Sequence, residues 1–392
     1  MIYPRAIFPR LADELARREN TVITGMRRVG KTTILRYLFS KLTTNNKVLL
    51  DLENPLNRKV FEEENYDRVW NNLAPFGITN STKAFILLDE VQNLPEVSRV
   101  VKYLSDHWDV KFVLTGSSSF YLKNLFPESM AGRKLIFEVF PLTFVEFLVF
   151  KGVKHNVAES FSQKAAGKNR TAYERVIAYY LEYMEFGGFP SIVLEESPER
   201  KQELLREIFK SYFEQDAKSL ADFKDMSKLR DLILLLIPRI GSRIEVAKLA
   251  SSLGVSRETV YNYLAFLEHT YFITLLPKFS ASIDRQAAGS KKLFLCDGGL
   301  ANILGRVSEG GLFEQSIFQN LRSHHTLNFY HKNGSEIDFI VEDNVALEGK
   351  VKASNRDILH LKTRAQVLKL TNYFVVSKEY SEEKEVIVVT DL

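Results

Sequence analysis

The sequence has little cysteine, no long apolar run and no recognisable export signal. Its single cysteine, Cys296, excludes an internal disulfide and a zinc cluster built from several cysteines. The longest apolar run, at residues 232–237, is far shorter than the ~20 residues that a membrane-spanning helix needs. The N-terminal segment contains no apolar stretch followed by a small-residue cleavage site. We therefore expect a soluble, cytoplasmic protein without a membrane partner.

Glycine, proline and net charge are also not in excess, which excludes further classes of chain. With 19 Gly and 11 Pro in 392 residues, the sequence is neither collagen-like nor a proline-rich low-complexity chain. Apolar residues make up 45% and charged residues 26%, which excludes a wholly disordered chain. The formal net charge of +4 is too small to argue for nucleic acid by itself. At roughly 100–200 residues per domain, the length predicts two to four domains.

Short apolar runs alternate with helix-like segments in the first third of the chain. The apolar runs predict strands at residues 21–24, 47–51, 84–89 and 111–115. Apolar residues at helical spacing predict helices at residues 31–42, 60–73 and 97–107. Strands that alternate with helices form a parallel sheet that is covered on both faces. This part of the chain is therefore predicted to be an α/β domain built on a parallel sheet.

Residues 25–32 match the phosphate-binding pattern GxxxxGK[ST] in full. A predicted strand precedes the pattern and an amphipathic helix follows it, so the backbone N–H groups of the turn would face a phosphate. Lys31 would reach the β- and γ-phosphates, and the Thr32 hydroxyl would hold Mg²⁺. We expect ATP and Mg²⁺ as cofactors. The predicted nucleotide-binding residues are Gly25, Arg27, Arg28, Val29, Gly30, Lys31, Thr32 and Thr33.

Four further residues are candidates for metal binding and catalysis. Asp89 ends the third predicted strand and would bind Mg²⁺, mostly through water. Glu90 follows it and would orient and deprotonate the attacking water. Ser117 is a candidate sensor of the γ-phosphate, or alternatively a cap of the following helix. Arg133 is a candidate arginine finger, from the same or a neighbouring subunit, or alternatively a surface arginine.

These motifs resemble those of one branch of the AAA+-type P-loop ATPases. The likeness includes the GxRRxGKTT turn, the LLDEVQ strand, the TGSSS and GR steps, the segment PLTFVEF and the step GGFP. This archaeal and bacterial group joins an ATPase domain to a C-terminal domain of unknown function. The resemblance covers nearly the whole chain and implies ATP binding and hydrolysis, but no particular substrate. It leaves open a homo-oligomer or a protein partner, because AAA+-type relatives often act in rings.

The middle of the chain is predicted to be helical and to contain a helix-turn-helix. The polar residues 153–171 predict a surface loop, and helices are predicted at residues 204–213 and 229–237. Two more helices are expected at residues 246–253 and 256–268, with Gly254 in the turn and Ser256 as a cap. Wing strands are expected at residues 271–276 and 292–296. Together these elements predict a winged helix.

The predicted winged helix has two interpretations. DNA could be contacted through the outer face of its second helix and through the wing side. The residues for this contact would be Arg257, Thr259, Tyr261 and Asn262 on the helix, and Lys291 and Lys292 near the wing. Alternatively, the face contacts protein, since Glu258 follows Arg257 and the face is not strongly basic.

An acidic constellation follows near the C-terminus. The predicted strands at residues 336–341 and 345–351 present Asp338, Glu348 and Lys350. This arrangement resembles the PD-(D/E)xK nuclease core, in which two carboxylates hold Mg²⁺ and the lysine orients water or stabilises phosphate charge. Further elements are a helix at residues 312–321, with Glu314 as a supporting carboxylate, and strands at residues 373–376 and 386–390. Alternatively, the same charges form a solvated face.

The connection between the two acidic strands decides whether the carboxylates meet. Side chains alternate along a strand, so Asp338 shares a face with Glu348 only if the two residues lie opposite each other. That pairing needs a three-residue loop at residues 342–344, in which Asn344 would adopt the left-handed conformation. A two-residue turn would place the carboxylates on opposite faces.

The predicted order of domains leads to three candidate functions. We expect a P-loop ATPase domain at residues 1–150, a helical linker and lid at 151–240, a winged helix at 241–300 and a nuclease-like α/β domain at 301–392. The main hypothesis is an ATPase that couples its nucleotide state to DNA handling. One alternative is a nucleotide-gated switch that hydrolyses ATP slowly and grips a protein. The other is an ATP-dependent DNA nuclease.

Overall fold

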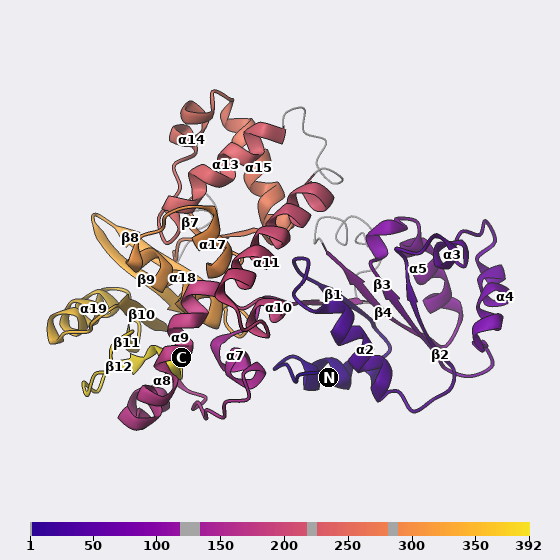
Figure 1. Ribbon diagram of the computed structural model, residues 1–392, viewed down its shortest axis with the longest axis horizontal. Coiled ribbons are helices and arrows are strands. Elements are labelled where there is room, and N and C mark those ends of the chain that lie inside the picture. Colours follow the sequence, from indigo (N-terminus) through magenta and orange to yellow (C-terminus); the bar gives the residue numbers. More distant parts are fainter. Residues whose placement is uncertain (1, 118–133, 218–225, 281–288) are drawn as a thin grey trace. The chain divides into compact units, whose positions relative to one another are not determined.

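A computed structural model describes residues 2–117, 134–217, 226–280 and 289–392 (Figure 1). The chain forms two compact units, Met1–Phe140 with His269–Tyr271, and Pro141–Glu268 with Phe272–Leu392. The expected divisions after residues 150, 240 and 300 all fall inside the second unit. One buried core there takes side chains from two stretches of the chain, Leu142 to Val193 and Leu276 to Val389, so these two stretches share an interior.

The first unit is built on a parallel sheet, as predicted, but the sheet has five strands where the sequence predicted four. Its strands are β1 (Asn20–Thr24), β2 (Lys47–Asp51), β3 (Ala84–Asp89), β4 (Val110–Gly116) and β5 (Lys134–Glu138). The strand order is β2-β3-β4-β1-β5 and every neighbouring pair is parallel. Strand β4 therefore lies between β1, which leads into the phosphate-binding pattern, and β3, which ends in the acidic pair.

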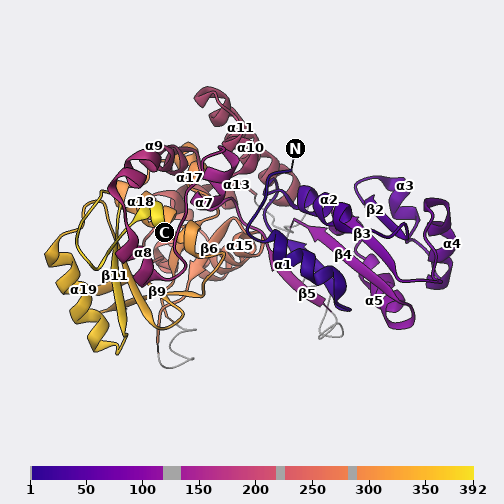
Figure 2. The same cartoon turned by 90° about the horizontal axis from the view of Figure 1, so that it is seen from below.

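Helices cover both faces of this sheet. They are α1 (Phe8–Asp13), α2 (Lys31–Lys41), α3 (Pro55–Lys59), α4 (Val69–Leu73) and α5 (Val97–His107). Helices α2 and α5 lie on opposite faces (Figure 2). The predicted helix at residues 60–73 is wrong except for its last turn. The Asn65 side chain accepts a hydrogen bond from the Asp67 backbone N–H and starts a separate 3₁₀ turn, Tyr66–Arg68, so no continuous helix forms.

The second unit begins with a run of helices, of which α7 and α10 pack against α9. They are α7 (Phe144–Phe150), α8 (Phe161–Gly167), α9 (Arg170–Phe186), α10 (Pro190–Val193), α11 (Pro198–Ser211) and α13 (Met226–Leu236). The expected loop at residues 153–171 is wrong in part, because it contains α8. Ser160 and Gln163 form a reciprocal capping box at the start of α8, and Ala165 is buried. In the described ranges, every helix is too short or too polar to span a bilayer.

The helix-turn-helix is present where the sequence predicts it. Helices α14 (Val246–Leu253) and α15 (Arg257–His269) are joined at Gly254, whose φ of 65° is left-handed. The Ser256 hydroxyl accepts a hydrogen bond from the Thr259 N–H at 3.0 Å. Strands β6 (Ile273–Leu276) and β7 (Lys292–Leu295) then pair antiparallel. The expectation that Lys292 faces DNA is wrong, because its side chain is completely buried.

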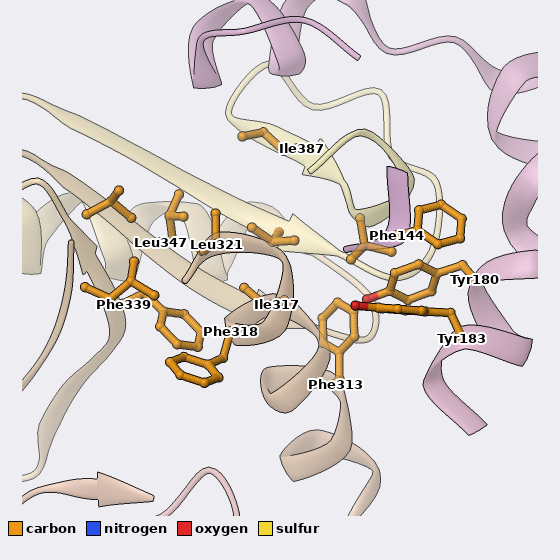
Figure 3. Close-up of a cluster of buried hydrophobic side chains, with 14 of the residues drawn as sticks. Phe144, Tyr180, Tyr183, Phe313, Ile317, Phe318, Leu321, Phe339, Leu347 and Ile387 are labelled. Atoms are coloured by element: carbon orange, nitrogen blue, oxygen red, sulfur yellow. The ribbon is translucent and has the colours of Figure 1, made fainter. Parts of the chain in front are cut away.

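The last part of the second unit is a mixed sheet with helices on its two faces. Its strands are β8 (Leu327–Lys332), β9 (Ser335–Val341), β10 (Val345–Lys350), β11 (Asn372–Ser377) and β12 (Val386–Val388), in the order β12-β11-β10-β9-β8. Helices α17 (Gly298–Leu304), α18 (Glu309–Leu321) and α19 (Asn355–Val367) complete the fold. Figure 3 shows α18 side chains such as Phe318 packed against Phe339 of the sheet, in a core that also contains Tyr180 and Tyr183.

Of the two connections considered for β9 and β10, the structure has the three-residue loop. Val345 pairs with Val341 and Leu347 with Phe339, so the loop has three residues and the register places Glu348 opposite Asp338. The conformation differs from the prediction in one respect. Glu342 and Asp343, with φ of 49° and 55°, carry the left-handed conformation that we expected at Asn344.

A buried carboxylate holds together three segments of the second unit. Asp297 caps α17 by accepting from the N–H of Gly299 at 2.9 Å, and its other oxygen accepts from the N–H of Gly188 at 2.7 Å and from Gln319 Nε2 at 3.1 Å. Gly188 in turn accepts, through its carbonyl, the N–H of Leu142 at 2.7 Å. A Cβ atom at Gly187 would lie 1.8 Å from Asp297 Oδ1, so the GGFP step has no room for a side chain there.

Candidate functional site

The turn between β1 and α2 has the backbone of a phosphate cradle. Gly25, Arg28 and Gly30 have positive φ of 148°, 64° and 99°, which lets the chain reverse tightly before the helix begins. A Cβ atom at Gly25 would lie 2.1 Å from the carbonyl oxygen of Val139. The first glycine of the pattern is therefore needed both for its conformation and for space.

The Lys31 side chain turns back over this cradle. Its residue is only 4% exposed, and Nζ donates to the carbonyl oxygens of Gly25 at 2.8 Å and Met26 at 2.9 Å. The ammonium group thus lies inside the turn, where a phosphate would meet it. Backbone carbonyls are uncharged, so these two contacts leave the positive charge of Lys31 unneutralised, which suits an anion.

The remaining predicted nucleotide-binding residues differ in exposure. Thr32 and Arg27 are half-buried, whereas Arg28 and Thr33 are exposed. The Val29 side chain is completely buried, so this residue can offer a ligand only its backbone.

Two features of the cradle fit an anion. Gly30 precedes helix α2 and supplies no side-chain cap, so the first N–H groups of the helix are available to a ligand, and the helix dipole favours negative charge there. At the end of β1, Thr24 Oγ1 is buried and has no hydrogen-bond partner among the described residues. ATP and Mg²⁺ therefore fit the residues present: the helix end and Lys31 suit phosphate, and Thr32 offers a hydroxyl for the metal.

The acidic pair is organised by a residue that the sequence patterns missed. Thr115 on β4 is buried; its hydroxyl donates to Asp89 Oδ1 and accepts from the Glu90 N–H at 3.1 Å. Glu90 adopts a left-handed φ of 53°, and its carboxylate accepts a hydrogen bond from the Gln92 amide. Thr115 thus fixes the carboxylate of one acidic residue and the backbone of the next.

Removing the Thr115 hydroxyl is expected to slow turnover without weakening nucleotide binding. The Thr115→Val variant keeps the shape of the side chain but leaves Asp89 and the Glu90 N–H without this partner. A lost hydrogen bond to a charged group costs about 1.5–3 kcal/mol, so we expect kcat for ATP to fall roughly tenfold or more. Steady-state ATPase rates and nucleotide Kd measure the two effects. Thr115→Ser, which keeps the hydroxyl, should restore turnover; equal rates in all three proteins would contradict this role.

Two predicted catalytic residues lie on the segment after β4. Ser117 directly follows the strand and is buried, two residues beyond Thr115. Arg133 lies outside the described residues.

Arg5 is a second residue that sequence reasoning missed. Its guanidinium donates to the carbonyl oxygens of Val29 at 3.1 Å and Phe140 at 3.0 Å, so it supports the cradle from outside the pattern. No local signal could have found it, because the contacts join residues 24 and 135 positions apart.

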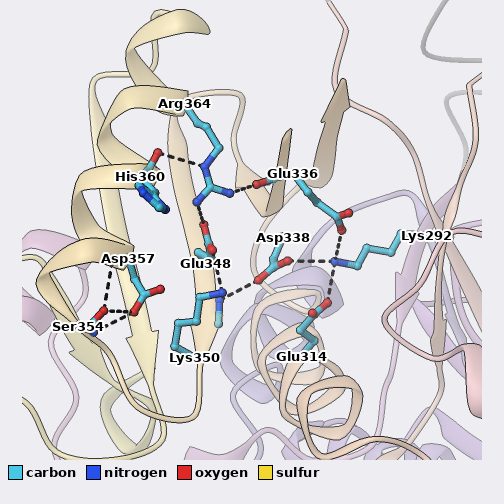
Figure 4. A network of polar contacts seen from close by, with 11 residues as sticks. Lys292, Glu314, Glu336, Asp338, Glu348, Lys350, Ser354, Asp357, His360 and Arg364 are labelled. Carbon is cyan, nitrogen blue, oxygen red and sulfur yellow. Dashed lines mark hydrogen bonds and ion pairs between the residues drawn. The ribbon is translucent and has the colours of Figure 1, made fainter. Parts of the chain in front are cut away.

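With this three-residue loop, Asp338 and Glu348 lie on one face of their sheet, but a lysine lies among the acidic residues (Figure 4). Lys292 Nζ from β7 contacts Glu314 Oε2 at 2.6 Å, Glu336 Oε1 at 2.9 Å and Asp338 Oδ1 at 3.2 Å. Burial alone would lower the pKa of Lys292, but the three carboxylates outweigh it and the pKa is raised. Burial, together with Asp338, raises the pKa of Glu314 to about 8.

Glu348 is paired separately with two cations. Its Oε1 contacts Lys350 Nζ at 2.9 Å, and its Oε2 contacts the guanidinium of Arg364 at 2.7 Å. Burial raises the pKa of Glu348, and the cation of Lys350 acts in the opposite direction. In the described parts of the chain, no three His, Cys, Asp or Glu side chains are arranged to hold a metal ion.

Two stretches of the chain match known families. Residues 17–148 match a family described as an AAA domain. This stretch of the chain contains the cradle, the acidic pair and Thr115. Residues 177–310 match a domain of unknown function (DUF8612), which contains the helix-turn-helix and the β6–β7 hairpin. The family likeness supports the AAA part of the resemblance and gives no function to the second stretch.

Relatives of the chain extend across both units. An uncharacterized protein of Methanocaldococcus jannaschii is 28% identical over 331 residues, which is 82% of this chain and 71% of the relative. An uncharacterized protein of Haemophilus influenzae is 25% identical over 393 residues, covering 94% of this chain and 93% of the relative. Neither name states an activity.

Solved structures give weaker likenesses. The Aeropyrum pernix ORC1 protein, solved in complex with DNA, aligns with 76% of this chain and 91% of its own at 16% identity, with a TM-score of 0.29. AMPPCP-bound DnaA from Aquifex aeolicus aligns with 67% of this chain and 86% of its own at 16% identity, with a TM-score of 0.28. At such low TM-scores, neither structure bears on how this chain works.

Proposed function

We propose that this chain is a magnesium-dependent ATPase whose nucleotide state controls DNA handling by its second unit. The observations that carry the ATPase part are the buried Lys31 in the turn before α2, and Thr115 on β4 hydrogen-bonded to Asp89 at the end of β3. The AAA-domain likeness of residues 17–148 supports it independently. Each of these features serves the binding of a nucleoside triphosphate.

The proposed roles follow from chemistry and position. Lys31 and the N-terminus of α2 would hold phosphate oxygens, and Thr32 with Asp89 would hold Mg²⁺. When bound, the metal neutralises charge on the transferring phosphate. Glu90 would orient the attacking water and accept its proton, since its backbone is fixed by Thr115.

Two roles are proposed on position in the chain. Ser117, at the carboxyl edge of the sheet, would sense the γ-phosphate. Arg133 would act as an arginine finger, either within the chain or across an interface of a homo-oligomer.

The DNA part of the proposal is supported by the exposed face of α15. Arg257, Tyr261 and Asn262 are exposed there, while Val260 and Leu264 on the opposite side are buried. A helix that packs through one face and offers Arg, Tyr and Asn on the other suits the major groove. With the β6–β7 hairpin beside it, we propose that this region is a winged helix that contacts DNA.

We expect DNA to stimulate ATP turnover, and we expect this stimulation to depend on DNA contacts made by α15. Steady-state ATPase is measured with single-stranded, duplex and branched DNA. Arg257→Ala should weaken duplex binding and flatten its salt dependence, because one phosphate or base contact is lost. Lys248→Ala, an exposed lysine on α14, is the matched control and should change neither. Turnover that no DNA alters would contradict the DNA role while leaving the ATPase role intact.

A second candidate is a nucleotide-gated switch that grips a protein. The mixed character of α15 favours it, since Glu258 follows Arg257 and Tyr261 is 60% exposed. An exposed tyrosine beside mixed charge is typical of protein interfaces. Tight retention of ATP, slow turnover and no effect of DNA would support this function over the first.

A further inference from the structure

We propose that Lys292 is the built-in cation of the C-terminal acidic cluster, so that this sheet holds no divalent metal and does not cleave nucleic acid. The cluster comprises Glu314 on α18, and Glu336 and Asp338 on β9. A divalent metal would be expected among such carboxylates in a nuclease. The proposal goes beyond the ATPase function and concerns different residues.

The position of the Lys292 ammonium group suits both the lysine and the carboxylates around it. An ammonium group has three donors, and its three carboxylate contacts at 2.6, 2.9 and 3.2 Å come from three separate residues. The lysine itself has no exposed surface. Two of these contacts are hydrogen bonds and the third, to Glu314, is an ion pair. Moving the buried ammonium away would leave buried carboxylates unpaired, so it is a stable occupant of the position.

The remaining oxygens of the expected metal pair are also occupied. Asp338 Oδ2 accepts the N–H of Gly349 at 2.9 Å. The two Glu348 oxygens are held by Lys350 and Arg364. All four oxygens of Asp338 and Glu348 therefore already contact a donor. Mg²⁺ requires near-octahedral oxygen ligands at about 2.0–2.1 Å and gives up water reluctantly, so it does not fit this arrangement.

The backbone around Lys292 is held on both sides by neighbouring strands. Lys292 pairs with Leu276 in the β6–β7 hairpin and forms a bridge with Arg243 on its other side. Because both edges of its strand are engaged, the backbone at Lys292 is fixed in place, with its side chain among the three carboxylates. Lys292 thus joins the β6–β7 hairpin to the β8–β12 sheet. The role of the acidic residues is to hold this lysine and so to stabilise the contact between the two sheets.

The test measures Mn²⁺ binding to the full chain without nucleotide, in a Lys31→Ala background that removes the phosphate lysine. Paramagnetic resonance or calorimetry should detect no site that depends on Asp338. Lys292→Met should create one Mn²⁺ site, and adding Asp338→Asn should abolish it. Lys291→Met, the neighbouring lysine, is the matched control and should create none.

Three results would overturn the proposal. The first is Mn²⁺ binding with Lys292 intact that disappears in Asp338→Asn, and this comparison needs no Lys292 variant should that variant fail to fold. The second is metal-dependent nicking of plasmid DNA that Asp338→Asn abolishes. The third is a folded Lys292→Met protein that gains no Mn²⁺ site. Because ATP is absent throughout, failure here is distinguishable from failure of the ATPase function.

Discussion

Replacing Lys31 with alanine is expected to lower ATP turnover by roughly 10²–10³-fold, as removal of a charge-stabilising donor does in other enzymes. The ammonium now lies within hydrogen-bond distance of the Gly25 and Met26 carbonyls, inside the turn that faces a phosphate. Without it, the β- and γ-phosphates lose their only cationic partner within the pattern's Gly-Lys-Thr step. Phosphate release at saturating Mg-ATP measures the rate, and calorimetry measures the nucleotide Kd.

Lys41→Ala provides the control for this substitution. Lys41 ends the same helix but is exposed and far along it from the cradle. Its removal should change neither rate nor Kd. Full activity of Lys31→Ala, with ATP binding unchanged, would show that the cradle is not the nucleotide site and would end the ATPase proposal.

Replacing Glu90 with glutamine should separate binding from hydrolysis. The amide keeps the size of the side chain and can still meet the Gln92 amide group, but it cannot accept a proton from water. General-base catalysis contributes typically 10²–10⁴-fold, so we expect kcat to fall by about that range with the nucleotide Kd nearly constant. Single-turnover measurements with bound ATP report the chemical step directly.

A nearby carboxylate serves as the comparison for Glu90. Glu96 is exposed, lies shortly after the same strand and has no place in the proposed chemistry. Glu96→Gln should hydrolyse ATP at the normal rate. If Glu90→Gln also did so, a different group would have to activate the water, and the assignment of Glu90 would fall.

Local patterns were sufficient for the parts of the fold that local physics determines. The cradle follows from glycine spacing before Lys31, and strands β2 and β3 from short apolar runs. The register of Asp338 and Glu348 follows from loop length, because side chains alternate along strands. Strand β5 escaped notice because only Phe137 of its residues is buried, which leaves a weak pattern.

Contacts between distant residues were beyond such reasoning. Thr115 serves the acidic pair across 26 positions, and its type is common at strand ends. Lys292 looked like a surface lysine because a neighbouring lysine precedes it, yet its carboxylate partners lie up to 46 positions away. The sequence contains these residues without any spacing that ties them together. Only the tertiary fold shows that the Lys292 ammonium group is paired with these carboxylates.

The hydrogen bonds of the Asp297 carboxylate have a consequence for truncated forms of this protein. Fragments that stop before it would leave the Gly188 amide, and through it the Leu142 segment, without their anchor. Buried donors that lose an acceptor are costly, so such truncations should aggregate or be digested by proteases. A deletion variant would then lose activity because the rest of the second unit unfolds. Single substitutions are therefore the better way to assign functions to residues of this unit.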